Sequence, residues 1–329
     1  MINWQLIRQE IELISHGLSK IETSIHSSYN WNEKTDVLVT DQAYQLLKYH
    51  NDRHADKAVL LVYSWVNSPD ILDFSEEISL VKTYQALGFD VFLIKWKLNS
   101  LDNKANNVES YYSLYIDQAV QIIQQKQYLS YHLSGICQGG VFALAYAALY
   151  PNTISSVTLM MAPIDHSDHN TLIYKLSQKM MLMVEAQNMI PGLYLQNFFS
   201  MLKPSQYYLG RVIDAASRKQ IKEYKIIEAW LNQTPDIPAE LLKNYIQEFI
   251  DENILISGKI DLSKITCPVL NVYAKYDRLV PSSSSISIEN RLQCHYLTCE
   301  LSGGHLSVLS DQKQQSIFKS FIKNNLLGR

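Results

Sequence analysis

Short apolar runs alternate with amphipathic segments along much of the chain. Residues 58–66 and 90–96 are mainly apolar runs, which is typical of strands buried on both faces of a parallel sheet. Helical patterns follow them at 79–87 and 110–125. The alternation predicts an α/β fold, with a mainly parallel central sheet and helices on both of its faces.

Further strands complete the predicted sheet. Residues 36–40 and 43–49 form a candidate strand pair ahead of the first buried strand. The remaining strands are predicted at 131–134, 156–161, 269–274 and 295–301. At the beginning of the chain, an amphipathic helix is predicted over residues 2–26, and packing onto its own domain and docking to a partner stay equally open.

The alternation stops between residues 163 and about 260, where the pattern is mostly helical. A compact fold does not leave such a stretch structureless. We therefore expect a helical cap inserted over the carboxyl edge of the sheet, where ligands of open α/β sheets bind. The predicted domains are an N-terminal helical segment (1–35), a core in two pieces (36–163 and 261–329) and the inserted cap, or lid (164–260).

Methionine and tyrosine gather in this cap. We interpret them mainly as core residues, with a mobile apolar face that covers substrate or meets a partner as the alternative. They are Met180, Met181, Met183, Met189, Met201, Tyr174, Tyr194, Tyr207 and Tyr208.

Composition excludes several classes of protein. The chain has 329 residues, 47% hydrophobic and 19% charged, so it can bury a large core. A net charge of -3 without a long basic run gives no indication of nucleic-acid binding. No stretch reaches the ~18 apolar residues of a membrane span, and the first residues carry charges where a signal peptide needs an apolar core. We expect a cytoplasmic protein.

One short segment carries the strongest chemical signal. Residues 135–140 read Gly-Ile-Cys-Gln-Gly-Gly, between a candidate strand and a helix that ends at Pro151. This is the pattern of a nucleophile elbow, in which Gly135, Gly139 and Gly140 let strand and helix approach closely around Cys137. A free cysteine is more often a small buried hydrophobe. The strand and helix on either side of Cys137 favour a nucleophile.

A nucleophile elbow is followed in chain order by an acid and then a histidine. Asp277 follows the strand predicted at 269–274, and His305 follows the last strand on a loop marked by Gly303 and Gly304. Both are therefore the candidate partners of the nucleophile. Asp261 and Asp311 are weaker alternatives for the acid.

Metal chemistry has little support in the sequence. Residues 165–169 read Asp-His-Ser-Asp-His, but no third ligand segment accompanies them, so a polar loop is the better interpretation. The four cysteines show neither paired metal spacing nor a disulfide framework. No metal and no tightly bound cofactor is implied.

The three candidates indicate a site for acyl transfer or hydrolysis. A histidine beside Cys137 activates it as a thiolate, and the thiolate attacks an acyl carbon to form a thioester. We expect the backbone N–H of Gln138, and one N–H from the loop near Val66, to hold the oxyanion. Because a thioester donor passes its acyl group to cysteine at nearly equal energy, thioester donors are the favoured substrates.

The chain resembles the catalytic subunits of polyhydroxyalkanoate synthases over roughly residues 35 to 325. The elbow alone is shared with many hydrolases, but the joint pattern is specific. It comprises Gly135–Gly140, Leu61–Asn67 with Pro69, Leu72 and Asp73, Ser79–Val81, Gly88–Ile94, Met201–Pro204, Trp230 with Pro235 and Asp236, Tyr276–Pro281 and Gly303–Leu306.

This resemblance implies an α/β-hydrolase core with a cap and a Cys137-Asp277-His305 triad. It also implies polymerisation of (R)-3-hydroxyacyl-coenzyme A, with 3-hydroxybutyryl-coenzyme A as the expected monomer donor. The length is similar to that of the short, two-component synthases (class III or IV). A second synthase subunit, a dimer of the catalytic subunit and a location at the surface of polyester granules are implied in the same way.

Two departures from the family pattern affect the expected partner and chain-length preference. Lys95 precedes Trp96 where relatives of this size often carry an acidic residue, and the cap is only loosely similar. Two other functions stay open. A cysteine-dependent thioesterase or esterase would use the same residues but admit water, and a catalytically silent binding module would merely keep the fold.

Overall fold

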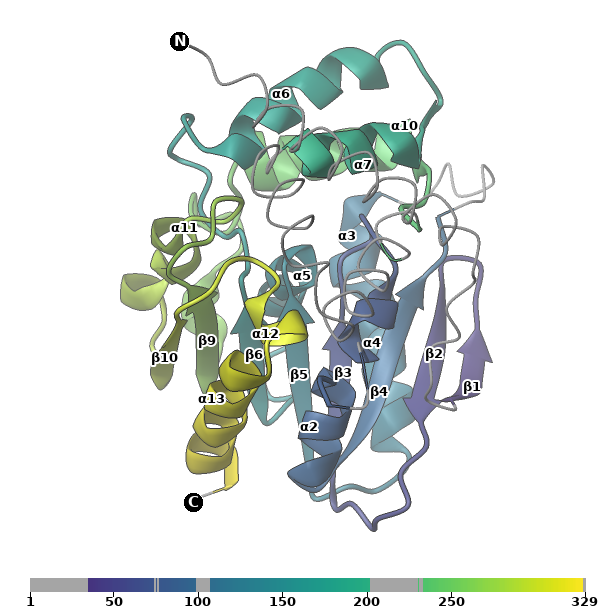
Figure 1. Cartoon of the computed structure of the whole chain (residues 1–329), viewed down its shortest axis with the longest axis vertical. Coiled ribbons are helices and arrows are strands. Elements are labelled where there is room, and N and C mark those ends of the chain that lie inside the picture. The colour runs from purple at the N-terminus through teal and green to yellow at the C-terminus, as the bar shows by residue number, and fades with distance from the viewer. Residues whose placement is uncertain are drawn as a thin grey trace, which may run out of the picture.

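The computed structural model describes residues 35–73, 75, 77–98, 107–201, 230 and 233–327. Within them, an 8-stranded sheet has the order β1-β2-β4-β3-β5-β6-β9-β10 (Figure 1). The strands are β1 (Thr35–Thr40), β2 (Tyr44–Tyr49), β3 (Lys57–Val62), β4 (Phe89–Trp96), β5 (Ser130–Ile136), β6 (Ser156–Met160), β9 (Val269–Ala274) and β10 (Tyr296–Leu301). The helix predicted over residues 2–26 lies outside the described residues.

The sheet is parallel from β4 to β10, which confirms the predicted architecture. Strands β1 and β2 pair antiparallel with each other, and β2 pairs antiparallel with β4. Because parallel strands end at one edge, the loops that follow β3, β5, β9 and β10 meet there. Each candidate triad residue comes directly after one of these strands.

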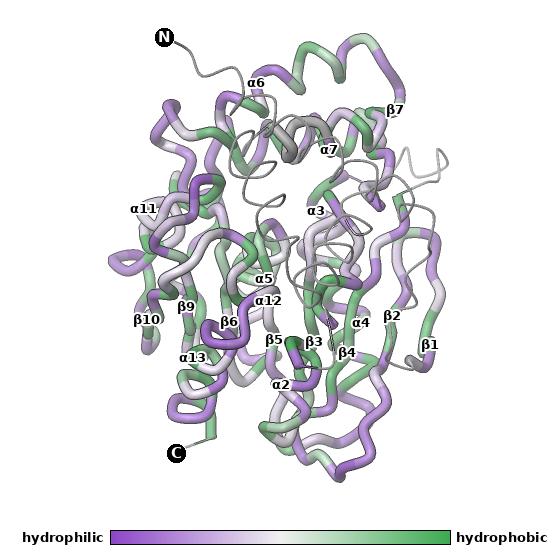
Figure 2. Tube along the Cα trace, in the orientation of Figure 1, coloured by the Kyte–Doolittle hydropathy of each residue, from purple (hydrophilic) through white to green (hydrophobic). Residues whose placement is uncertain are grey.

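Helices cover both faces of the sheet. One apolar cluster joins α4 (Leu114–Gln124) and α5 (Gln138–Leu149) to one face, and a second joins α2 (Leu80–Ala86) and α13 (Gln312–Ile322) to the other. Figure 2 shows α5 as mainly hydrophobic, in agreement with the burial of nearly all of its residues, whereas α13 carries hydrophilic stretches. The short elements of the core are α3 (Val108–Tyr112), α11 (Ser282–Ile286), α12 (Ser307–Ser310), η1 (Pro69–Asp73), η4 (Leu262–Lys264), η5 (Glu289–Arg291) and η6 (Lys323–Leu327).

Two predicted elements have different bounds in the structure. The strand predicted at 58–66 ends at Val62, and the chain continues as a loop that reaches the candidate site. The helix predicted at 110–125 is divided at Ser113, where the backbone N–H (2.9 Å) and the hydroxyl (2.7 Å) both donate to the carbonyl of Glu109.

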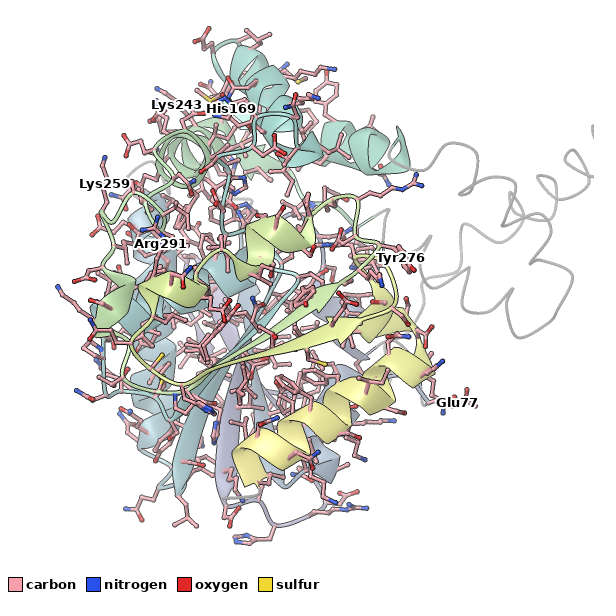
Figure 3. All side chains as sticks on the ribbon, turned by 90° about the vertical axis from the view of Figure 1, so that its left-hand side faces the viewer. Glu77, His169, Lys243, Lys259, Tyr276 and Arg291 are labelled. Atoms are coloured by element: carbon pink, nitrogen blue, oxygen red, sulfur yellow. The ribbon has the colours of Figure 1, made fainter. Side chains whose placement is uncertain are left out.

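Between β6 and β9 the chain forms a layer above the carboxyl edge of the sheet (Figure 1). Its elements are α6 (Leu172–Val184), β7 (Met189–Ile190), α7 (Gly192–Met201), β8 (Ile237–Pro238), α10 (Ala239–Tyr245) and the π-helix η3 (Ile246–Asp251). Figure 3 shows His169 and Lys243 in this layer, at the top of the view. We propose that residues 164–260 form the cap, as the sequence indicates.

The cap packs onto the core through apolar and polar contacts. Met180 is buried, and Met181 and Met183 pack against the same apolar cluster, so these three methionines serve as core. The indole of Trp230 donates to the carbonyl of Ser68 at 2.6 Å. The side chain of Met201 and the tyrosines at 207 and 208 lie outside the described residues.

None of the described helices combines the length and the apolar character that are needed to span a lipid bilayer.

Candidate active site

Cys137 occupies a sharp turn between β5 and α5. Its backbone has φ 53 and ψ -124, a conformation that costs a non-glycine residue roughly 1–3 kcal/mol. The surrounding backbone holds it there, since the Cys137 N–H donates to the carbonyl of Met160 at 2.8 Å and the Gly140 N–H donates to the Cys137 carbonyl at 2.9 Å. The turn presents a partly exposed thiol at the carboxyl edge of the sheet.

The glycines of the elbow are required by close backbone approach. A Cβ on Gly139 would collide with the carbonyl of Val62 at the end of β3, and a Cβ on Gly135 would lie 2.5 Å from the Cα of Gly140. Neither contact can be relieved by a side-chain rotation, because the obstacle is backbone in both cases. The strand, the turn and the helix therefore form one rigid unit around Cys137.

Asp277 begins the loop after β9, with its carboxylate almost fully buried. One carboxylate oxygen, Oδ1, accepts the backbone N–H groups of Leu279 and Val280, both at 2.9 Å. The other, Oδ2, lies 2.7 Å from Nδ1 of His305. The loop thus fixes one oxygen of the carboxylate and leaves the other to orient the imidazole.

His305 lies between Asp277 and Cys137. Burial alone would lower the pKa of His305, but the charges of Asp277 and Cys137 and hydrogen bonds to both side chains raise it to about 10. Because Nδ1 is held by Asp277, Nε2 is the nitrogen left for the thiol. The imidazole is therefore placed to accept the thiol proton and to remain beside the resulting anion.

The two alternative acids have other partners. Asp261 precedes η4, and its carboxylate accepts from the backbone N–H and the hydroxyl of Ser263. Asp311 is the N-cap of α13 and accepts the N–H groups of Lys313 and Gln314. Each carboxylate satisfies the first turn of a helix, which supports Asp277 as the acid.

The two predicted oxyanion donors differ in whether their N–H groups already have an acceptor. Gln138 is the first residue of α5, where backbone N–H groups have no acceptor within the helix. The Val66 N–H donates to the hydroxyl of Ser64 at 3.1 Å, and the Trp65 N–H donates to Oε1 of Gln138 at 3.2 Å. The assignment of Gln138 and Val66 stays a prediction.

Sequence reasoning did not find the side-chain roles of three residues near the elbow. The Gln138 side chain binds the loop after β3. Burial raises the pKa of the Tyr63 and Tyr245 phenols, and both lie close enough to Cys137 for its charge to raise them further. Tyr245 comes from cap helix α10. No local pattern marks these residues, since only the tertiary fold brings them to the elbow.

The Asp-His-Ser-Asp-His segment forms a polar loop at the base of the cap. Oδ1 of Asp165 accepts from Ser167 and from the amide of Asn253 at 3.0 Å. His166 is buried, which lowers its pKa to about 4, and its Nε2 lies 3.1 Å from the Pro163 carbonyl. In the part of the chain that the structure describes, no three His, Cys, Asp or Glu side chains are grouped to hold a metal ion.

A cavity of about 220 Å³ adjoins the loop after β3, and the triad residues are not among those that line it. Its walls are the loop after β3 (63–70), the end of β4 with Lys95 and Trp96, and residues 233 and 235 of the cap segment. Lys95, one of the two departures from the expected family pattern, therefore lines this cavity.

The fold and the elbow define an α/β-hydrolase-fold protein with a thiol in the nucleophile position. The model of the alpha/beta hydrolase fold family matches residues 57–312. Among solved structures, a monoacylglycerol lipase of Paleococcus ferrophilus is 15% identical with a TM-score of 0.58, covering 85% of this chain and 97% of its own. The hydrolase GrgF of Penicillium is 13% identical with a TM-score of 0.58, covering 90% of this chain and 99% of its own. At such identities the likeness shows the fold alone.

Curated relatives identify the family to which the chain belongs within this fold. The poly(3-hydroxyalkanoate) polymerase subunit PhaC of Synechocystis is 33% identical over 78% of this chain and 74% of its own length. The PhaC subunit of Allochromatium vinosum is 31% identical over 82% of this chain and 81% of its own. The chain belongs to this family of poly(3-hydroxyalkanoate) polymerases, within the α/β-hydrolase fold. The expected fold class and the family resemblance are both confirmed.

Proposed function

We propose that this protein is the catalytic subunit of a poly(3-hydroxyalkanoate) polymerase, an acyltransferase that uses (R)-3-hydroxyacyl-coenzyme A and releases coenzyme A. The arrangement that supports this function most directly is the buried Asp277-His305 pair at 2.7 Å beside the strained Cys137. The family membership supplies the substrate class, because the relatives are named for this polymer.

The first half of the cycle loads the enzyme. Nε2 of His305 takes the proton of the Cys137 thiol, and the thiolate attacks the thioester carbon of the substrate. The negative charge that develops on the carbonyl oxygen faces the N-terminus of α5 and the predicted oxyanion donors, Gln138 and Val66. The carbon-sulfur bond to coenzyme A then breaks, and coenzyme A leaves with the proton from His305.

The second half extends the chain. His305, oriented by Asp277, accepts the proton of the hydroxyl group of the next hydroxyacyl unit, and the resulting alkoxide attacks the thioester on Cys137. An ester bond forms, the bond to the sulfur breaks, and the proton passes from His305 back to the sulfur. The buried carboxylate of Asp277 stabilises the imidazolium formed in each half.

The decisive experiment follows coenzyme A release and product together. The purified chain should release coenzyme A from (R)-3-hydroxybutyryl-coenzyme A and form insoluble polyester, and Cys137→Ala should lower the rate by on the order of 10³-fold or more. The control is Cys294→Ala, at another partly buried free cysteine, which should keep the wild-type rate. Free 3-hydroxybutyrate without polymer would instead identify a thioesterase.

The assembly and location are part of the same proposal. The relatives are named subunits, which supports a requirement for a second, different synthase subunit. We expect polymer formation to accelerate when that subunit is co-expressed, the catalytic subunit to dimerise in the active form, and the protein to be found at the surface of polyester granules in the cytoplasm. Equal rates with and without the partner would contradict the two-component assignment.

A further inference from the structure

The side chain of Gln138 joins the nucleophile helix to the loop after β3. Its Oε1 atom accepts the backbone N–H of Trp65 at 3.2 Å and the hydroxyl of Ser64 at 3.3 Å. Ser64 in turn accepts the N–H of Val66 at 3.1 Å. The amide of Gln138 is 4% exposed, so these bonds form away from bulk water and depend little on solvent.

The same amide also contacts the cap. Tyr245, the last residue of α10, lies beside Gln138: burial raises the pKa of its phenol, and the Gln138 side chain, as a donor, acts in the opposite direction. Since Oε1 already accepts two bonds, the NH₂ group of Gln138 is the donor left for this contact. The ring of Tyr245 packs on Trp65 at 5.7 Å and on Phe142 at 6.1 Å, which holds the hydroxyl at the elbow.

One side chain therefore connects three segments that come together only in the folded protein. The backbone N–H of Gln138 is a predicted oxyanion donor, and the loop that its side chain holds carries the other. Donors of this kind act only when their spacing matches the oxyanion, because a displacement of a fraction of an ångström weakens the bond in the transition state.

We propose that Gln138 is a positioning residue, whose side chain fixes the loop at residues 64–66 relative to Cys137 and, through Tyr245, makes that position depend on the cap. This inference rests on the proposed function. It explains why a polar side chain is buried at a position where an apolar one would pack without any need for partners.

Kinetics of two variants and their combination test the proposal. Gln138→Met keeps the volume and removes the contacts of the amide with Trp65, Ser64 and Tyr245, so kcat for coenzyme A release should fall about 10- to 100-fold with little change in KM. Tyr245→Phe should give a smaller loss. The double variant should be no slower than Gln138→Met, because the Tyr245 hydroxyl acts through Gln138. Unchanged kcat in Gln138→Met overturns the proposal, and additive losses overturn the link to the cap.

A matched control and a second readout separate positioning from folding. Gln315 is also buried and also accepts a distant backbone N–H, that of Ser79 at 3.2 Å, so Gln315→Met should leave kcat unchanged. Hydrogen exchange of the Trp65 amide should accelerate in Gln138→Met but not in Gln315→Met. Hydrogen exchange needs no substrate. Unaltered exchange of the Trp65 amide in Gln138→Met therefore overturns the positioning role of Gln138, whether or not the polymerase activity is found.

Discussion

Cys137 shows how a single residue is made reactive by the structure around it. The unfavourable backbone conformation at φ 53 is maintained by bonds to the neighbouring strand and by the glycines of the elbow. The strain keeps the sulfur at the start of α5, where partial positive charge favours an anion, and within reach of His305. Reactivity is thus a property of the whole turn.

Asp277 is expected to act by orienting His305. An asparagine at this position can still accept the N–H groups of Leu279 and Val280 through its carbonyl, so the loop should keep its shape. The amide cannot hold the imidazole in the required tautomer, so Asp277→Asn should lower kcat by roughly 10² to 10⁴-fold. Steady-state coenzyme A release measures this loss. Asp261→Asn, at a helix N-terminus, is the control and should retain wild-type kcat.

The raised pKa of His305 makes stability depend on pH. Its pKa is about 10 in the fold against 6.5 ordinarily. A group with a raised pKa adds stability that is complete below pH 6.5 or so and is lost as the pH rises towards about 10. The free energy of unfolding should therefore fall more steeply over this range in the wild type than in His305→Gln. Urea unfolding at several pH values measures the slope.

The matching control for this pH experiment is His54→Gln, which alters an exposed histidine and should keep the wild-type slope. Equal slopes in the wild type and His305→Gln would contradict the proposed charge interaction.

At the scale of elements, the contact between β3, β5 and α5 depends on the absence of side chains. Gly139→Ala places a methyl group against the Val62 carbonyl and should lower the free energy of unfolding by more than about 3 kcal/mol. Gly304→Ala is the control, because the nearest atom to its Cβ is the Tyr276 carbonyl oxygen at 3.8 Å. Denaturant unfolding compares the two, and similar stability in both variants would refute this account of the elbow.

The sequence predicted the elements that carry the candidate site because each is a local pattern. A buried apolar run followed by a turn places Cys137, Asp277 and His305 at strand ends, and the parallel topology then brings those ends together. The chain order of nucleophile, acid and histidine added the specificity that no single motif has. Tertiary structure did not override these local signals.

Other features were beyond prediction because they depend on contacts between distant segments. The strand β3 stops at Val62 because the following residues bind Gln138, which is 73 positions away from Trp65. Tyr245 reaches the elbow from a short cap helix without a sequence signature. The helix predicted at 110–125 is divided at Ser113, where the backbone departs locally from helical geometry. None of these features produces a periodic pattern in the sequence.

Across the whole molecule, the candidate base depends on an edge of the sheet. His305 follows β10, which among the described strands is an edge strand paired with β9 and partly exposed. Edge strands open before the centre of a sheet does, because fewer contacts hold them. Activity should therefore be lost at a lower temperature than global structure. Residual activity after heating, compared with the far-ultraviolet circular dichroism melting curve, measures the difference, and coincident curves would contradict this expectation.

The position of the cap in the chain has a consequence for the evolution of the family. The cap segment leaves the core after β6 and returns before β9, and these two strands are direct neighbours in the sheet. An insertion whose two ends lie so close together can lengthen, shorten or diverge without displacing Asp277 from Cys137. Different members of the family can therefore replace or remodel this segment. Variation in the accepted monomer can arise there while the residues of the core stay unchanged.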